Sequence, residues 1–324
     1  MRRCFYIFTI VMFASCAGHA CADFMGSLDG IVFTPAIKIG YQSMGCTINI
    51  PNFPTSSALS TELYNRGPLD LSLKNANVWV GEIDLNAGVG RISALFSAEA
   101  GAPTNITLET QQEPFWGGLF KVRWQGSQFQ YSSFDGRAAY ELHPGISLAA
   151  GFKARKWSVN LKGPIDPLGI IQSYHNIFGD DYTADFSAKT YIPYLGIGAD
   201  GLNFKVSLLF SPIAWVDAKV PFRYLFVDIV PFRFGYEDDR YILKKNGLFL
   251  EFAADTDFNV RPGVKCSLWI KGNWLRIKGN GKQDYRNQLV LSGVPTAQFS
   301  DSSSATGIFI SHSLSGGIAV EGTF

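Results

Sequence analysis

The sequence predicts an all-β chain that folds into one transmembrane antiparallel β-barrel of about ten strands. Three observations predict it: a secretory leader at the N-terminus, strand-like alternation of apolar and polar residues, and connections that alternate between short and long. The composition agrees, because only 17% of the 324 residues are charged while 14% are aromatic. Soluble domains usually carry about a quarter charged residues. The apolar residues are therefore expected to face lipid.

The N-terminus has the three parts of a secretory signal peptide. Met1-Arg2-Arg3 is positively charged, Cys4 to Phe13 is mostly apolar, and Ala20-Cys21-Ala22 offers the small residues that a signal peptidase recognises. We therefore expect a signal peptide over residues 1–22 and a barrel domain over residues 23–324.

The cysteines leave two questions open. Phe13-Ala14-Ser15-Cys16 loosely resembles a lipobox, so a lipoprotein signal is the alternative to simple cleavage. Cleavage after residue 22 leaves only Cys46 and Cys266, too few for a metal site. In an oxidising compartment these two thiols either pair or stay free.

Alternation with a period of two dominates the chain after residue 22, and no segment there has the 18 or more apolar residues of a membrane helix. Polar residues, among them Lys, Glu and Asp, fall between the apolar ones in mid-strand, as in a hydrated or salt-bridged barrel lumen. The alternating apolar sets are Ile83, Leu85, Ala87 and Val89; Leu202, Phe204, Val206, Leu208 and Phe210; Leu248, Leu250, Phe252 and Ala254; and Val264, Cys266, Leu268 and Ile270.

The connections predict the strand count. Short turns fall at Gly88–Arg91, His143–Gly145, Asp200–Gly201 and Arg261–Gly263, and Gly and Pro there suit tight-turn geometry. Outer-membrane barrels have short periplasmic turns and long external loops. Four turns and five loops join ten strands with both chain ends in the periplasm. The longer polar segments lie near 51–75, 101–115, 163–182, 213–245 and 280–303.

Two regions leave that count open. Residues 116–142 are long for one strand, and a turn or bulge is expected at 125–127 or 135–136. Residues 221–236 form either an extracellular hairpin that extends the wall or an additional transmembrane pair, which would give twelve strands. A soluble periplasmic β-protein is a further alternative, but the final strand ends in Phe324, which resembles the signal recognised in the assembly of outer-membrane barrels.

Three segments resemble strands of the omptin family of outer-membrane barrels: Ile146–Val159, Tyr191–Gly198 and Phe210–Asp217. The resemblance implies ten long strands and five external loops. It also implies a proteolytic site, because omptins hold a water between an Asp pair on one wall and an Asp–His pair on the opposite wall. The carboxylates polarise that water and the His takes its proton.

The residues of that site are missing from this sequence. Only Asp217 follows Trp215, without a nearby His, and the stretch 96–116 offers Glu99, Glu109 and Glu113 but no Asp. The sequence therefore predicts an omptin-like shape without omptin-type proteolysis.

The histidines are the remaining catalytic candidates. His143 is expected to be solvated in a periplasmic turn. His175 precedes Asp180-Asp181 in an external loop, where it is either a proton shuttle, a weak cation site or a solvated loop residue. His312 precedes Ser313, a pair that resembles outer-membrane lipid deacylases, but alternation places the two on opposite faces of a strand.

Thirteen charged residues are expected to face the lumen, where they form either a salt-bridge network in a closed barrel or a small, slightly cation-lined pore. A bulge that slips the register by one residue would turn them outward. They are Glu82, Asp84, Lys121, Arg123, Arg137, Glu141, Lys153, Lys189, Lys205, Glu251, Asp255, Lys265 and Lys271.

Two classes of function follow. The first is a non-enzymatic outer-membrane barrel, acting as a surface-exposed binding or structural protein or as a narrow, porin-like channel. The alternative is a hydrolase of peptide or lipid that uses external-loop residues. The expected partners are membrane lipid, lipopolysaccharide and, through Phe324, the barrel-assembly machinery. Neither a cofactor nor a metal is expected, and the balance of 28 basic and 27 acidic residues excludes a basic field for nucleic acid.

Overall fold

The structure is a computed structural model that describes residues 31–50, 69–112, 120–165, 183–226, 233–244, 246–291 and 294–322. No helix among them is long and apolar enough to cross a membrane. The described elements are β1 (Val32–Ile50), β2 (Leu69–Val89), β3 (Ile92–Gln112), β4 (Phe120–His143), β5 (Ile146–Ile165), β6 (Thr183–Asp200), β7 (Phe204–Ser211), β8 (Trp215–Phe226), β9 (Arg233–Lys244), β10 (Asn246–Arg261), β11 (Val264–Leu291) and β12 (Val294–Gly322).

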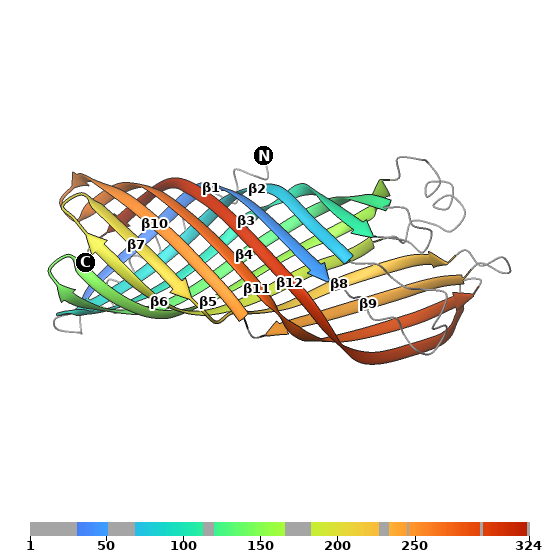
Figure 1. Cartoon of the computed structure of the whole chain (residues 1–324). Coiled ribbons are helices and arrows are strands. Elements are labelled where there is room, and N and C mark those ends of the chain that lie inside the picture. Colours follow the sequence, from blue (N-terminus) through green and yellow to red (C-terminus); the bar gives the residue numbers. More distant parts are fainter. Residues whose placement is uncertain are drawn as a thin grey trace.

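These strands form a closed antiparallel barrel with ten wall positions (Figure 1). β1 pairs with β2 on one side and with β12 on the other, which closes the wall. β7 and β8 share one wall position, because both pair with β6. β10 and β9 share the next, because both pair with β11. The all-β barrel of ten strands is confirmed, and an additional transmembrane pair at 221–236 is wrong. There β8 and β9 form a hairpin that lengthens the wall.

The four short turns expected from the sequence lie together at one end of the barrel. Three of them contain a glycine with positive φ, namely Gly90, Gly145 and Gly263, a conformation that costs glycine little. In outer-membrane barrels, short turns of this kind lie at the periplasmic end.

At the opposite end the strands run far into segments expected to be loops. β11 and β12 stay paired to Leu291↔Val294, so the loop expected at 280–303 is wrong. Alternation there is weak because Ser and Gly replace apolar residues, which concealed the strands. β4 is one strand whose register shifts at 124–125 and 127–130, so the first expected bulge is present. Residues 135–136 pair regularly.

The seam between the first and last strands depends on two facing glycines. Gly40 pairs with Gly317, and a Cβ on Gly317 would overlap the carbonyl oxygen of Ile39. A Cβ on Gly40 would lie 2.5 Å from the Trp269 ring. The missing side chains let β1 and β12 approach closely while the Trp269 indole fills the space inside the barrel.

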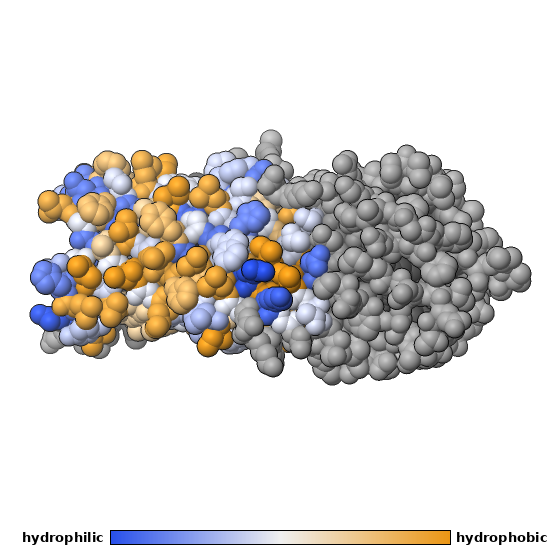
Figure 2. All heavy atoms as spheres, in the orientation of Figure 1, coloured by the Kyte–Doolittle hydropathy of each residue, from blue (hydrophilic) through white to orange (hydrophobic). Residues whose placement is uncertain are grey.

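The half of the barrel nearest the short turns, here called the membrane section, carries an apolar outer face (Figure 2). An apolar band of this kind is typical of a barrel wall that faces lipid. Its large exposed residues include Ile39, Ile83, Leu85, Phe96, Phe134, Leu148, Leu195, Ile197, Leu208, Phe210, Leu250, Phe252, Leu268, Ile270, Leu314 and Ile318.

Farther from the short turns the polarity of the wall reverses, and this part is called the distal section. Its outer face exposes Asn77, Lys156, Lys189, Lys219, Arg276, Lys278, Thr306 and His312. Its inner face buries Cys46, Ile48, Leu73, Phe129, Trp157, Val159, Phe186, Ala188, Val216, Ala218, Leu243, Leu275, Ile277 and Phe309. The distal section therefore has the polarity of a water-soluble protein with its own core.

We predict that Gly317→Val impairs barrel closure. The added side chain overlaps the β1 backbone, and overpacking of this kind costs about 1–3 kcal/mol. The fraction of refolded protein with a heat-dependent mobility shift on a detergent gel should fall. Gly272→Val is the matched control, because the nearest atom to its Cβ is a leucine methyl 3.6 Å away. If both variants show the same fraction of folded protein, the close approach of β1 and β12 at Gly40 and Gly317 is not required for barrel closure.

Candidate functional site

Two clusters of charged side chains fill the interior of the membrane section. In the first, Lys271 of β11 reaches across the barrel to β2 and β3, with its Nζ 2.7 Å from Glu82 Oε2 and 3.0 Å from Glu99 Oε2. Lys38 of β1 lies beside it, 2.8 Å from Asp84 and 3.5 Å from Glu82. This cluster joins the first three strands to β11.

The second cluster is centred on Glu251 of β10. Its carboxylate accepts hydrogen bonds from Lys153 and, at 2.7 Å, from Arg155, both on β5. The Arg155 guanidinium also donates to Asn273 Oδ1 of β11 at 2.8 Å. Asp135 accepts a hydrogen bond from the Tyr194 hydroxyl, and its carboxylate lies 3.2 Å from Lys153 Nζ.

These clusters act as cross-barrel ties. Lys153 and Glu251 are each about 4% exposed, and charges that deep are stable only when paired. Most partners come from strands that are not neighbours, so the pairing fixes the distance between opposite walls. The charged groups of these clusters are therefore paired mainly with one another.

Beyond the ionic clusters an aromatic core closes the distal section. Trp157 of β5 packs on Phe186 of β6 with ring centroids 4.8 Å apart. From the other side of the barrel, Phe309 of β12 stacks on Trp157 at 6.4 Å. Phe129 and Ile277 are also fully buried in this core. The described part of the interior therefore holds packed side chains at both levels.

The structure places most of the thirteen expected lumen charges on the inner face. Glu82, Asp84, Lys153, Glu251 and Lys271 lie in the two clusters. Lys205 lies near the short-turn end of the barrel, 3.5 Å from Asp257 and 3.3 Å from Glu321. Strand alternation puts four more on the inner face, partly exposed: Arg137, Glu141, Asp255 and Lys265. Lys121 and Arg123 have side chains outside the described part.

The inward placement of Lys189 is wrong. The buried inner positions of β6 are even-numbered, Ala188 and Thr190 among them, and Lys189 is exposed on the outer wall. The error has a physical reason. In the distal section the inner face is apolar, so a lysine in a strand of this section points to the outer face.

Several network residues were missed by sequence reasoning. Asp135 and Arg155 have the same parity as Arg137 and Lys153 on their strands, so alternation contained the signal for both. Asn273 carries no charge, and only its contacts with Arg155 and Ser313 reveal its role.

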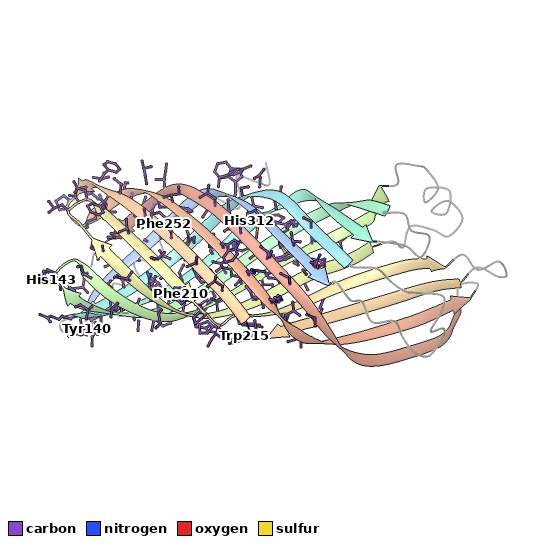
Figure 3. The ribbon with its side chains drawn as sticks, in the orientation of Figure 1. Tyr140, His143, Phe210, Trp215, Phe252 and His312 are labelled. Carbon is purple, nitrogen blue, oxygen red and sulfur yellow. The ribbon has the colours of Figure 1, made fainter. Side chains whose placement is uncertain are left out.

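The expected catalytic candidates do not assemble within the described residues. His312 is exposed on the outer wall, whereas Ser313 is buried inside, which confirms their opposite faces (Figure 3). His143 is exposed in the β4–β5 turn, with its Nδ1 3.3 Å from the Pro144 carbonyl. His175, Asp180 and Asp181 lie outside the described residues.

The residues at the omptin-like positions do not form the protease site either. Strand alternation places Asp217 on the outer face of β8, between buried Val216 and Ala218. Glu99 is held by Lys271. Glu109 and Glu113 have side chains outside the described part.

The two cysteines are free and lie on opposite sides of the wall. Cys46 is buried in the distal core, whereas strand alternation puts Cys266 on the lipid side of β11. Because the wall separates them, they do not pair.

The outer wall also carries a basic cluster, the outer lysine patch, made of Lys156, Lys189 and Lys219. Lys189 faces Lys156 across β5–β6 and Asp217 across β6–β8. Next to the patch, toward the membrane section, is an aromatic trio whose ring centroids lie 5.8 to 6.3 Å apart: Phe152, Tyr191 and Trp215. Aromatic rings followed by cations are typical of a membrane interface.

We predict that Glu251→Gln costs about 3 kcal/mol or more, because it leaves Lys153 and Arg155 without their shared charge. Lys205→Ala should cost less than about 1 kcal/mol, because that lysine is half-exposed and screened. Urea unfolding of the refolded barrel, followed by tryptophan fluorescence, measures both. Equal losses would mean that the central cluster has no special role.

Comparison with known proteins places the fold. No family model and no curated protein sequence matches the chain. Its structure resembles the outer membrane protease OmpT from Escherichia coli, with a TM-score of 0.58 and 17% identity over 92% of this chain and 98% of that one. It also matches the P. putida toluene transporter TodX, with a TM-score of 0.32 and 10% identity over 92% and 91% of the chains. The chain therefore has the fold of a closed β-barrel similar to that of OmpT.

Proposed function

We propose that this protein is a closed, non-catalytic outer-membrane barrel that acts through its extracellular end as a surface-exposed binding or structural protein. The packed side chains in the described part of the interior carry this proposal. Ion pairs occupy the membrane section and an aromatic core occupies the distal section. A chain organised in this way offers its free surface outside the membrane.

A narrow channel is the less favoured form of this function. An aqueous path would have to pass the Trp157–Phe186–Phe309 stack, whose rings come from three strands on two sides of the barrel. Solvating that path would expose apolar rings to water at a cost of about 25 cal/mol per Å².

A hydrolase is the other alternative, supported by the fold likeness to the protease OmpT. A fold alone does not carry a reaction. The described residues offer Glu99 already paired with Lys271, and His312 on the outer wall. Acid–base chemistry needs a base within hydrogen-bond reach of its substrate, and these residues do not converge on one point.

We predict that the folded protein does not conduct. Refolded protein that shows the heat-dependent mobility shift should give no single-channel steps in a planar bilayer. The triple variant W157A/F186A/F309A should give measurable current, because it removes the aromatic core. Stable steps from the unaltered protein would reject the closed barrel.

We further propose that the outer lysine patch contacts the phosphates of lipopolysaccharide. The patch adjoins the aromatic trio at the lipid boundary, and each surface lysine contributes about 1 kcal/mol toward an anionic leaflet.

The double variant K156A/K189A should therefore weaken lipopolysaccharide binding about thirtyfold at low salt, and less at high salt. The control is Arg261→Ala, an exposed cation in a periplasmic turn. Binding to vesicles that contain lipopolysaccharide measures the effect. The same loss in the control would point to net charge rather than the patch.

A further inference from the structure

The first ionic cluster holds more acidic than basic side chains. Its carboxylates belong to Glu82 and Asp84 of β2 and to Glu99 of β3, here called the acidic trio. Its ammonium groups belong to Lys38 and Lys271, and no other described cation forms an ion pair with the trio. Three carboxylates therefore share two ammonium groups.

The second cluster is balanced. Lys153 and Arg155 provide two positive charges, and Glu251 and Asp135 provide two negative charges. The surplus negative charge is therefore confined to the acidic trio.

The trio is buried too deeply for solvent to compensate a surplus charge. Glu82, Asp84 and Glu99 are only 7%, 7% and 5% exposed. Burying an ionised carboxylate costs several kcal/mol unless a cation compensates it. Lys38 and Lys271 each already serve two carboxylates. Two oxygens of the trio, Asp84 Oδ1 and Glu99 Oε1, are buried without a hydrogen-bond partner. One further positive charge is therefore expected at one of these carboxyls.

A proton suits this place better than a metal ion. A metal ion such as Ca²⁺ or Mg²⁺ needs several oxygen ligands that converge on one point. The described residues contain no group of three or more His, Cys, Asp or Glu side chains that could hold one. A proton needs a single oxygen, and two neighbouring carboxylates that share a site commonly keep one proton between them.

Asp84 is the carboxyl best placed to carry that proton. Three donors surround Glu82 and favour its ionised form: Lys271 at 2.7 Å, Ser97 Oγ at 3.0 Å and Lys38 at 3.5 Å. Asp84 points to the same side of β2 and lies within side-chain hydrogen-bonding reach of Glu82. Two ionised carboxylates repel each other at this separation, whereas a protonated Asp84 donates a hydrogen bond to Glu82.

We propose that the acidic trio binds one proton at neutral pH, carried by Asp84 and donated toward Glu82. The proton comes from water as the barrel forms. It leaves two negative charges opposite the ammonium groups of Lys38 and Lys271, so the first three strands are tied to β11 without surplus charge.

The surroundings of Asp84 favour the same state, because acidic groups outnumber basic ones on the strands packed around it. Asp135 and Glu321 have lysine partners of their own, Lys153 and Lys205. The charged groups nearest to Asp84 on each strand are Lys38 (β1), Glu82 (β2), Glu99 (β3), Asp135 and Arg137 (β4), Asp255 (β10), Lys271 (β11) and Glu321 (β12).

Infrared spectroscopy of the refolded full-length protein at neutral pH tests the proton directly. Exposed carboxyls are ionised at that pH, so the carbonyl-stretching band of a protonated carboxylic acid reports a buried one. The band should be present, should shift when aspartate carries a heavy carbon isotope in its carboxyl, and should be absent from Asp84→Asn. Absence of the band from the unaltered protein overturns the proposal. A band that persists in Asp84→Asn places the proton elsewhere and also overturns it.

Asp84→Asn and Glu82→Gln form a matched pair on one face of β2. The first replaces a neutral acid by a neutral amide, so the folding equilibrium constant at neutral pH should change by less than about fivefold. The second removes the negative charge that two lysines share, so the constant should fall by about a hundredfold or more. Urea unfolding followed by tryptophan fluorescence measures both. Equal losses in the two variants would mean that Asp84 is ionised, against the proposal.

Proton uptake on folding also gives a pH dependence of fixed sign. In the unfolded chain Asp84 is an ordinary carboxyl that is ionised above about pH 4, whereas the folded chain keeps the proton. The folding equilibrium constant should therefore fall as the pH rises, by up to about tenfold per pH unit. Asp84→Asn lacks this uptake, so its constant divided by that of the unaltered protein should rise with pH.

A ratio that stays constant between about pH 5 and pH 8 overturns the proposal. Added sodium or calcium chloride at fixed pH and ionic strength provides the remaining control. If either salt stabilises the unaltered protein and not Asp84→Asn, the trio binds a metal cation in place of the proton, and the proposal is wrong.

Discussion

Each wall position of this barrel has to satisfy two surroundings in succession, and the rest of the structure follows from that constraint. On β5, Phe152 faces lipid while Lys153 faces the ionic interior. A few residues on, Lys156 faces outward and Trp157 is buried inside. Lipid outside forces the polar residues inward, and water outside forces the apolar residues inward. This reversal of polarity divides the interior of one continuous barrel into an ionic level and an apolar level.

The ionic level contributes specificity more than stability. Burying charges is costly, and a pair such as Lys153–Glu251 at best offsets its own desolvation. A one-residue slip of β5, however, would turn Lys153 and Arg155 into lipid, at about 2–4 kcal/mol for each cation near the bilayer midplane. The alternative register is thus penalised strongly. The ties across the barrel also set the distance between strands that are not neighbours.

Much of the barrel was predictable because the relevant signals are local. Turn glycines such as Gly145 and Gly263 and the alternation around Phe252 gave the strand ends, the faces and the count of ten. The distal section was not predictable, because the rule of apolar residues outward reverses there. Lys189 was misplaced for that reason. The residue that completes the central cluster, Asn273, is recognisable only from a partner 118 positions away in the sequence.

The division into two levels also limits where chemistry can arise. A catalytic group needs a polar environment that is incompletely satisfied before substrate binds. In the membrane section Glu99 and Glu251 form ion pairs with cations of other strands, and the buried atoms left without a hydrogen-bond partner include Glu99 Oε1 and Arg155 Nε. In the distal section the interior is a core of rings, and opening it would expose them to water. The wall itself is held by backbone hydrogen bonds and an apolar outer face, neither of which demands a particular interior. This barrel therefore has a fold similar to that of OmpT at 17% identity, while the described part of its interior holds ion pairs and packed aromatic rings.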